Sequence, residues 1–339
     1  MTQPIPAAAV SGAAPAIQCT LCPRGCTMAE YERGRCKVRV NKGGQLYTLV
    51  YGKPCAVHID PIEKKPFFHF LPATAILSIA TAGCCLECKY CQNWEISQAW
   101  PEETINQDLS PEAVVKGAVA SRCRSIAYTY TEPTIFYEYM YDTSVLARRM
   151  GLRNVSVTCG YINPEPLREL CQVLDAANVD LKGFTDEFYV VNCGGRLQPV
   201  MDCILTMKKL GVHVEITNLV VPTKNDNMDL IRQMCAWVVQ NTGADTPLHF
   251  SRFSPDYRLR QLPPTPIETL VKARDIALAE GLRYVYVGNV PGEDYENTIC
   301  PGCKKPVIRR MGYRVVDFEI DRETSQCLYC HYKIAGVWK

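Results

Sequence analysis

Short apolar runs that alternate with longer amphipathic stretches restrict the fold of this chain more than any other feature. The apolar runs lie at residues 76–82, 125–130, 154–159, 178–182, 212–221, 248–253 and 284–288. Helical periodicity covers 111–121, 133–150, 164–174, 198–210, 228–240 and 266–280, and several of these stretches have a proline near their start. A repeat of strand and helix predicts successive βα units around a parallel sheet, and therefore an α/β fold.

Polar side chains occupy alternate positions in four of the predicted strands. They are Tyr128 and Tyr130, Asp180 and Lys182, His213, Glu215 and Thr217, and His249 and Ser251. A strand covered on both faces is apolar throughout, so a polar stripe indicates that one face lines a functional interior. The alternative is that these groups only pair across the sheet. We therefore expect a partial TIM-like (β/α)6 to (β/α)7 barrel rather than an open doubly wound sheet.

Length and charge limit the domain organisation and the partners. The 339 residues suffice for one large core with small appendages. We expect a disordered tail at 1–17, a Cys-rich segment at 18–70, the barrel at 71–292 and a further Cys-rich module at 293–339. A formal charge of +2 without long runs of one sign excludes an evident nucleic-acid or membrane-surface partner.

The sequence shows no targeting or membrane segment. The first 17 residues lack the basic and apolar parts of a secretory signal. The longest uncharged stretch, 71–86, is too short for a bilayer-spanning helix. We expect a cytoplasmic protein.

Cysteine is unusually frequent, with 19 residues. Twelve of them fall in three groups of four, at 19–36, 84–91 and 300–330, and each group contains a C-x2-C pair. A chain of this size does not need disulfides for stability, so the grouping favours metal or iron–sulfur ligation in a reducing compartment.

The central group follows the first strand of the predicted barrel. Cys84, Cys88 and Cys91 form C-x3-C-x2-C, and Cys85 lies among them as an expected non-ligand. Three thiolates can hold three irons of a [4Fe–4S] cubane and leave the fourth open. S-adenosylmethionine (SAM) can chelate an open iron and be cleaved by one-electron reduction to methionine and a 5′-deoxyadenosyl radical. A zinc loop or chance core thiols are the alternatives.

The two flanking groups predict separate metal sites. Cys300, Cys303, Cys327 and Cys330 form two C-x2-C knuckles, which is typical of a zinc ribbon or a rubredoxin-like module. Zinc is our first expectation there, with iron as the alternative. Cys19, Cys22, Cys26 and Cys36 could hold zinc or an auxiliary iron–sulfur cluster, and here too zinc is expected first.

The central motif, with its aromatic residue before the third Cys, resembles the radical SAM signature. That resemblance implies that Tyr90 lies near the adenine and that Thr131 and Glu132 bind the SAM amino group. Thr158-Cys159-Gly160 resembles the Thr-Asn-Gly of glycyl-radical-enzyme activases, with Cys159 in place of Asn. Asp180 and Lys182 match their Asp-x-Lys, where Lys approaches the SAM carboxylate. His249 resembles their ribose-side His.

Across residues 18–338 the order of features resembles the AmmeMemoRadiSam-system radical SAM enzymes, which are related to pyruvate formate-lyase activating enzyme. The matching stretches are 19–23, 60–66, 69–70, 91–97, 128–133, 252–257 and 336–338. The resemblance implies AMME-type and Memo-type partner proteins and an oxygen-sensitive cytoplasmic enzyme.

We therefore expect a radical SAM enzyme that abstracts hydrogen from a protein or peptide and takes electrons from a flavodoxin or ferredoxin. Activation of a glycyl radical enzyme is one version, and modification of a peptide is the other. The alternative is a non-catalytic iron–sulfur or zinc scaffold, or an electron-transfer protein, in a multiprotein complex.

Overall fold

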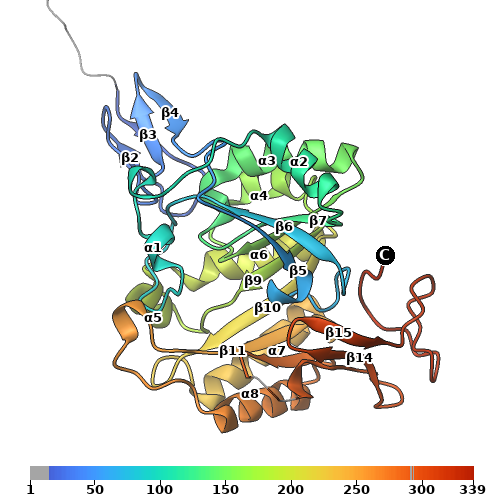
Figure 1. The fold of residues 1–339 in the computed structure, drawn as a ribbon. Coiled ribbons are helices and arrows are strands. Elements are labelled where there is room, and N and C mark those ends of the chain that lie inside the picture. Colours follow the sequence, from blue (N-terminus) through green and yellow to red (C-terminus); the bar gives the residue numbers. More distant parts are fainter. Residues whose placement is uncertain (1–14, 291, 293) are drawn as a thin grey trace, which may run out of the picture.

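A central sheet of eight strands organises the computed structural model, which describes residues 15–339 except 291 and 293 (Figure 1). The expected tail therefore lies largely outside the described residues. The strand order is β12-β11-β10-β9-β8-β7-β6-β5. The strands are β5 (Ala56–Pro61), β6 (Ala75–Ala80), β7 (Ser125–Tyr128), β8 (Arg153–Thr158), β9 (Ala176–Asp180), β10 (His213–Val220), β11 (Leu248–Arg252) and β12 (Val285–Gly288).

Strands β6 to β12 are parallel neighbours in chain order, which confirms the predicted α/β fold. The helices between them are α2 (Pro111–Ala120), α3 (Tyr137–Arg149), α4 (Pro164–Leu170), α6 (Leu197–Lys209), α7 (Met228–Thr242) and α8 (Ile267–Ala279). Proline occupies the first position of α2 and α4, where its missing N–H costs no hydrogen bond. Two short helices, α1 (Trp94–Ser97) and α5 (Asp186–Phe188), lie in loops at the carboxyl ends of strands.

Strand β5 is an unpredicted antiparallel edge strand, whose residues were expected to belong to the Cys-rich segment at 18–70. It pairs with β6 from Ala56↔Ala80 to Pro61↔Ala75. Within the described residues β5 and β12 form no ladder with each other, so hydrogen bonds do not close the sheet into a barrel.

The polar stripe of β10 and β11 divides into two levels. Thr217 and Ser251, near the carboxyl ends of these strands, line a cavity, whereas Glu215 and His249 lie deeper in the sheet and contact each other. Tyr128 lies on the helix-covered face instead, where its hydroxyl donates to Asn154 Oδ1 at 3.2 Å.

Residues 66–71, which we call the plug segment, cover the deeper level. Glu215 is fully buried and accepts hydrogen bonds from the backbone N–H groups of Phe68 and His69, at 3.0 and 2.8 Å to Oε1. The Nε2 atoms of His213 and His249 lie 3.2 and 2.7 Å from its two oxygens. Five polar groups on three segments are thus satisfied in one buried network.

The C-terminal module, residues 298–339, packs against the plug segment. It contains a three-stranded antiparallel sheet of β13 (Thr298–Ile299), β14 (Pro306–Met311) and β15 (Arg314–Phe318). Buried Arg310 donates from Nη2 to the Phe68 carbonyl at 2.9 Å. The Val337 N–H donates to the His69 carbonyl at 2.8 Å, and the Leu71 N–H donates to the Val337 carbonyl at 2.7 Å.

The N-terminal segment carries two small antiparallel ladders. They are β1 (Ile17–Gln18) with β2 (Thr27–Met28), and β3 (Arg39–Lys42) with β4 (Gln45–Thr48). Figure 1 shows this segment beside the short helix α1, at the end of the sheet where the predicted cluster loop lies.

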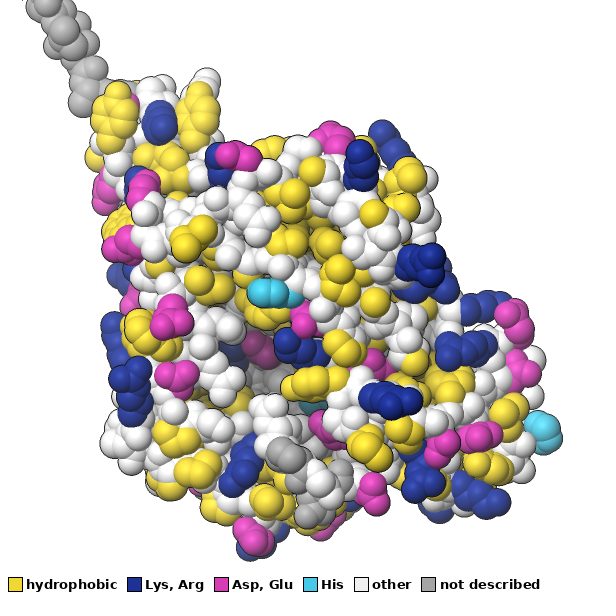
Figure 2. Space-filling view, viewed as in Figure 1, with side chains coloured by type: hydrophobic (Ala, Val, Ile, Leu, Met, Phe, Trp, Pro, Cys, Tyr) yellow, Lys and Arg dark blue, Asp and Glu magenta, His cyan; other side chains and the backbone are white. Residues whose placement is uncertain are grey.

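The surface agrees with the balanced charge of the sequence. Figure 2 shows acidic and basic side chains interspersed over one face of the molecule, with a hollow near its centre. None of the helices in the described part of the chain has the length and apolar character that a bilayer crossing demands.

Candidate active site

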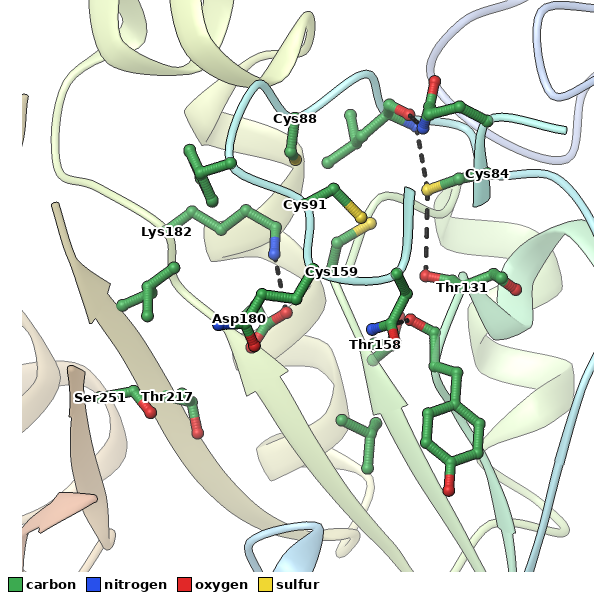
Figure 3. A pocket seen from close by; sticks show the side chains of 18 of the residues that line it. Cys84, Cys88, Cys91, Thr131, Thr158, Cys159, Asp180, Lys182, Thr217 and Ser251 are labelled. Atoms are coloured by element: carbon green, nitrogen blue, oxygen red, sulfur yellow. Dashed lines mark hydrogen bonds and ion pairs between the residues drawn. The ribbon is translucent and has the colours of Figure 1, made fainter. Parts of the chain in front are cut away.

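A cavity of about 220 Å³ opens at the carboxyl ends of the strands (Figure 3). Cys84, Cys88 and Cys91 lie on its wall together with residues from the ends of β8, β9, β10 and β11. Ligands of parallel α/β sheets bind at this edge because the loops that carry functional groups converge there.

Backbone hydrogen bonds shape the loop that carries the three cysteines. The Gly83 N–H donates to the Ile96 carbonyl at 2.9 Å, which closes the loop at its two ends. The N–H groups of Glu87 and Lys89 donate to Cys193 and Asn192, both at 2.9 Å. These acceptors belong to the π-helical turn η4 (Tyr189–Cys193), which therefore holds the loop in position.

Gly83 occupies a position where a side chain has no room. Its φ is +91°, and a Cβ would lie 2.3 Å from the Cys36 carbonyl oxygen and 2.8 Å from Val38 Cγ1. We expect Gly83→Ala to destabilise the fold by about 1–3 kcal/mol through overpacking, in addition to backbone strain. Chemical denaturation measures the change. Gly151→Ala is the control, because Gly151 has a φ of +74° and open space around it; equal losses in both variants would contradict the overpacking.

The thiols of the loop differ in their surroundings. Burial raises the pKa of Cys91 to about 11, although the hydroxyl of Ser97, 3.2 Å from its sulfur, opposes this shift. A hydrogen bond from the Cys193 thiol lowers the pKa of Cys88. Because iron binds the thiolate, an iron at Cys91 would have to hold this thiol deprotonated by its own charge.

The donor set fits an iron–sulfur cluster better than a single ion. Among the described residues, only the four C-terminal cysteines bring three or more potential metal ligands within 4.8 Å of one another. Cys84, Cys88 and Cys91 share a cavity wall at wider spacing, which suits a cubane that takes one thiolate on each of three irons.

Lys182 and Asp180 form an ion pair in the same cavity, with Nζ 2.7 Å from Oδ2 (Figure 3). Burial alone would lower the pKa of Lys182, but Asp180 and nearby thiolates, including that of Cys88, raise it well above its usual value. Lys182 therefore remains an ammonium group.

Thr131 and Thr158 line the cavity, but Glu132 does not. The Glu132 carboxylate is completely buried and accepts four hydrogen bonds. The donors are Thr134 N (3.1 Å), Thr134 Oγ1 (2.7 Å), Thr158 Oγ1 (2.7 Å) and Cys159 N (2.8 Å). In this arrangement Glu132 joins the ends of β7 and β8, and its oxygens are already engaged.

We expect Glu132→Gln to disturb this junction, because the amide NH2 would face donors where the carboxylate accepts. The expected loss is about 1–3 kcal/mol in the free energy of unfolding, the cost of an unsatisfied buried group. Thermal unfolding measures the difference. Glu165→Gln replaces an exposed acid at the start of α4 and should change little; a Glu132→Gln variant as stable as this control would refute the expectation.

His249 and Tyr90 have different placements. His249 does not line the cavity; it lies beneath it, with Nε2 2.7 Å from Glu215 and its ring against Phe68 and Tyr286. Tyr90 does line the cavity, and its hydroxyl is 3.1 Å from Cys193 Sγ.

Several residues of the cavity wall were not named as site residues from the sequence. They are Leu86, Gln92, Asn93, Gln98, Tyr130, Val157, Cys159, Thr217, Leu219, Ser251 and Asn289. The alternation of polar residues in β10 and β11 pointed to Thr217 and Ser251. Asn289 follows β12, and its Nδ2 lies 3.2 Å from Ser251 Oγ.

The four C-terminal cysteines form a closed site away from the cavity. The sulfur atoms of Cys300 and Cys330 are 3.6 Å apart, and those of Cys303 and Cys327 are 3.8 Å apart. A metal–sulfur distance of about 2.3 Å places tetrahedral thiolates about 3.8 Å apart. The predicted four-Cys metal site of this module therefore has the geometry of a single tetrahedral ion.

The sequence matches a known family and a close relative. The model of the radical SAM superfamily covers residues 78–237. The chain is 50% identical over 318 residues to "Uncharacterized protein MJ0808" of Methanocaldococcus jannaschii, covering 94% of this chain and 95% of that protein. It is 23% identical over 193 residues to the pyruvate formate-lyase-activating enzyme of Clostridium pasteurianum, covering 53% of this chain and 80% of that enzyme.

A solved structure has a similar fold. Streptococcus suis SuiB, in a crystal structure with bound S-adenosylmethionine, aligns with a TM-score of 0.50 at 10% sequence identity. The alignment covers 67% of this chain and 53% of SuiB, so about two thirds of this chain match about half of that protein.

Proposed function

Because this chain belongs to the radical SAM superfamily, and is thus an enzyme that cleaves SAM at an iron–sulfur cluster, we propose that Cys84, Cys88 and Cys91 ligate that cluster. The single observation that carries this assignment is that all three cysteines of one loop line the same cavity at the strand ends. The match to the radical SAM superfamily and the likeness to an activating enzyme favour an enzyme over the scaffold alternative.

The side chains of the cavity wall can bind and orient SAM beside the cluster. A reduced [4Fe–4S] cluster supplies one electron, which converts SAM to methionine and a 5′-deoxyadenosyl radical. The ammonium group of Lys182 faces the cavity and attracts the SAM carboxylate. Thr131 and Thr158 present polar groups to SAM. Glu132 does not contact SAM; it accepts a 2.7 Å hydrogen bond from Thr158 Oγ1 and so positions that side chain.

We further propose that the radical abstracts hydrogen from a protein or peptide. The relative named pyruvate formate-lyase-activating enzyme supports a protein substrate. The wall formed by Thr217, Ser251 and Asn289 offers uncharged hydrogen-bonding groups, which suit backbone amides better than a charged metabolite.

Three assignments rest on the sequence resemblance and remain proposals. They are the AMME-type and Memo-type partners of an AmmeMemoRadiSam system, a flavodoxin or ferredoxin as reductant, and a cytoplasmic location. For the C-terminal site we propose zinc, because four thiolates at tetrahedral spacing form a closed structural site. Metal analysis distinguishes zinc from a rubredoxin-like iron.

The decisive experiment is anaerobic incubation of reconstituted protein with SAM and dithionite, followed by mass spectrometry of 5′-deoxyadenosine and methionine. We expect both products from the parent protein and none from Cys88→Ala. Absence of deoxyadenosine from protein with a verified cluster would refute the proposed function.

The two substrate versions give different products. Activation of a glycyl radical enzyme leaves a radical on the partner, which electron paramagnetic resonance (EPR) detects. Modification of a peptide leaves a stable mass change on a co-purified or candidate partner. If neither occurs while deoxyadenosine forms with candidate partners present, the protein-substrate proposal fails and SAM cleavage stands.

A further inference from the structure

The two flanking four-Cys groups differ in geometry. The C-terminal sulfur atoms lie within 4.8 Å of one another, whereas those of Cys19, Cys22, Cys26 and Cys36, all described residues, form no such group. They nevertheless lie in one small fold, because the Cys19 N–H donates to the Cys26 carbonyl at 2.9 Å. A cubane distributes its thiolates over four irons, so it requires wider spacing than one tetrahedral ion.

A buried cationic group lies beside these thiols. Arg39 is 4% exposed, and its Nε has no hydrogen-bond partner among the described residues, although its other nitrogens pair with Glu138. The Arg39 guanidinium lies near the thiols of Cys19 and Cys36. An unpartnered donor beside clustered thiols suits a sulfur atom of an anionic cluster.

The four-Cys segment is attached directly to the loop that carries Cys84, Cys88 and Cys91. Arg24 Nε donates to the Cys85 carbonyl at 2.7 Å. On the other side, the Cys36 carbonyl lies so near Gly83 that no Cβ fits between them. The two groups of ligands are therefore neighbours across one packed interface.

Cys85 connects the two groups. Its thiol contacts the thiols of Cys22 and of its neighbour Cys84. Its sulfur lies 4.0 Å from Cys159 Sγ, and its side chain is 1% exposed. Because Cys85 is a buried thiol between two expected ligands, its S–H can donate to a cluster thiolate on either side.

We propose that Cys19, Cys22, Cys26 and Cys36 bind a second [4Fe–4S] cluster, instead of zinc, and that this cluster passes electrons to the SAM-cleaving site through the contact of Cys22 with Cys85 and Cys84. This inference rests on the proposed function for the direction of electron flow. The four-Cys site itself does not depend on it.

The electron count balances with one external donor. A low-potential flavin or iron–sulfur protein reduces the N-terminal cluster by one electron. The same electron moves to the cluster held by Cys84, Cys88 and Cys91, and then to the sulfonium of SAM. One carbon–sulfur bond of SAM breaks, which gives methionine and the 5′-deoxyadenosyl radical, and no proton is transferred.

Iron and sulfide analysis of the full-length protein tests the site. After anaerobic reconstitution we expect about eight irons per chain in the parent and about four in each of two variants. One variant carries Cys84→Ala, Cys88→Ala and Cys91→Ala, and the other carries Cys26→Ser and Cys36→Ser. Cys171→Ser, which changes a buried thiol at the end of α4 outside the three four-Cys groups, is the control and keeps about eight. Mössbauer spectra separate a single iron at the C-terminal site from cubanes.

The possible results separate the two proposals. Zinc in the N-terminal site, with an iron-free triple Cys→Ala variant, would overturn this inference and leave the proposed function intact. An N-terminal cluster without any iron at Cys84, Cys88 and Cys91 would refute the proposed function and the relay, and would leave the N-terminal cluster site intact.

EPR of the reduced parent tests the relay. Two neighbouring paramagnetic clusters should broaden each other's signals, and the broadening should disappear in either cluster-deficient variant. Two independent, unbroadened signals in the parent would overturn the relay. Cys85→Ser should keep about eight irons but change the reduction potential of the N-terminal cluster, because it alters a hydrogen bond to a ligand sulfur.

Discussion

Cys327→Ser is expected to unfold the C-terminal module while most of the sheet remains folded. The side chain of Cys327 is completely buried in a small core with Cys300, Ile308 and Trp338, and three short strands cannot bury enough apolar surface alone. Metal binding in structural zinc sites contributes about 10–16 kcal/mol to the folding of such modules. Hydrogen exchange should show loss of protection at residues 306–318.

The loss should also reach the plug segment. Arg310 donates to the Phe68 carbonyl and Val337 to the His69 carbonyl, so exchange of nearby amides should accelerate. Cys235→Ser is the matched control, because Cys235 is equally buried but lies on α7 outside any four-Cys group. Unchanged protection of 306–318 in metal-free Cys327→Ser would show that the module folds without its ion.

Glu215→Ala is expected to be the most destabilising single change in the sheet. The substitution removes the acceptor of the Phe68 and His69 N–H groups and of both histidine Nε2 atoms, all in a buried network. Removal of one partner from a buried charged network costs about 3–5 kcal/mol. Urea denaturation measures this loss, and Glu268→Ala, at an exposed position in the first turn of α8, should lose less than about 1 kcal/mol.

The stabilising effect of Glu215 should depend on pH with a defined sign. Burial alone would raise its pKa, but hydrogen bonds from His213 and His249 and their charges lower it well below the usual value. Its contribution is therefore complete above the unfolded-state pKa of about 4.3 and is lost as pH falls through the folded-state pKa. The difference in unfolding free energy between parent and Glu215→Ala should shrink as the solution is made more acidic than about pH 4. A difference that grows below pH 4 would contradict this account.

The sequence predicted the repeating units well because each has a local signal. The seven apolar runs correspond to β6 to β12, and prolines mark the starts of α2 and α4. The antiparallel strand β5 was not predicted, because residues 56–61 form a strand only by pairing with β6, beyond the plug segment. Such a pairing depends on contacts distant in sequence and leaves little local trace.

How far below the cavity a strand residue lies was equally hard to predict from the sequence. His249 and Ser251 lie on one face of β11, but each residue adds about 3.3 Å of strand, so His249 lies about 7 Å deeper. That distance separates a cavity wall from a buried network. Glu132 follows β7 in the loop before Pro133, and its saturation by Thr134, Thr158 and Cys159 follows only from the three-dimensional arrangement.

The pairing of the plug segment with Val337 affects how this protein can be synthesised. The His69 and Leu71 backbone groups find their partner at Val337, far later in the chain. On the ribosome, the plug segment therefore stays without these hydrogen bonds until Val337 has left the exit tunnel. A chain truncated before Val337 would lack them, so we expect such a truncated chain to be cleaved faster by proteases at the plug segment.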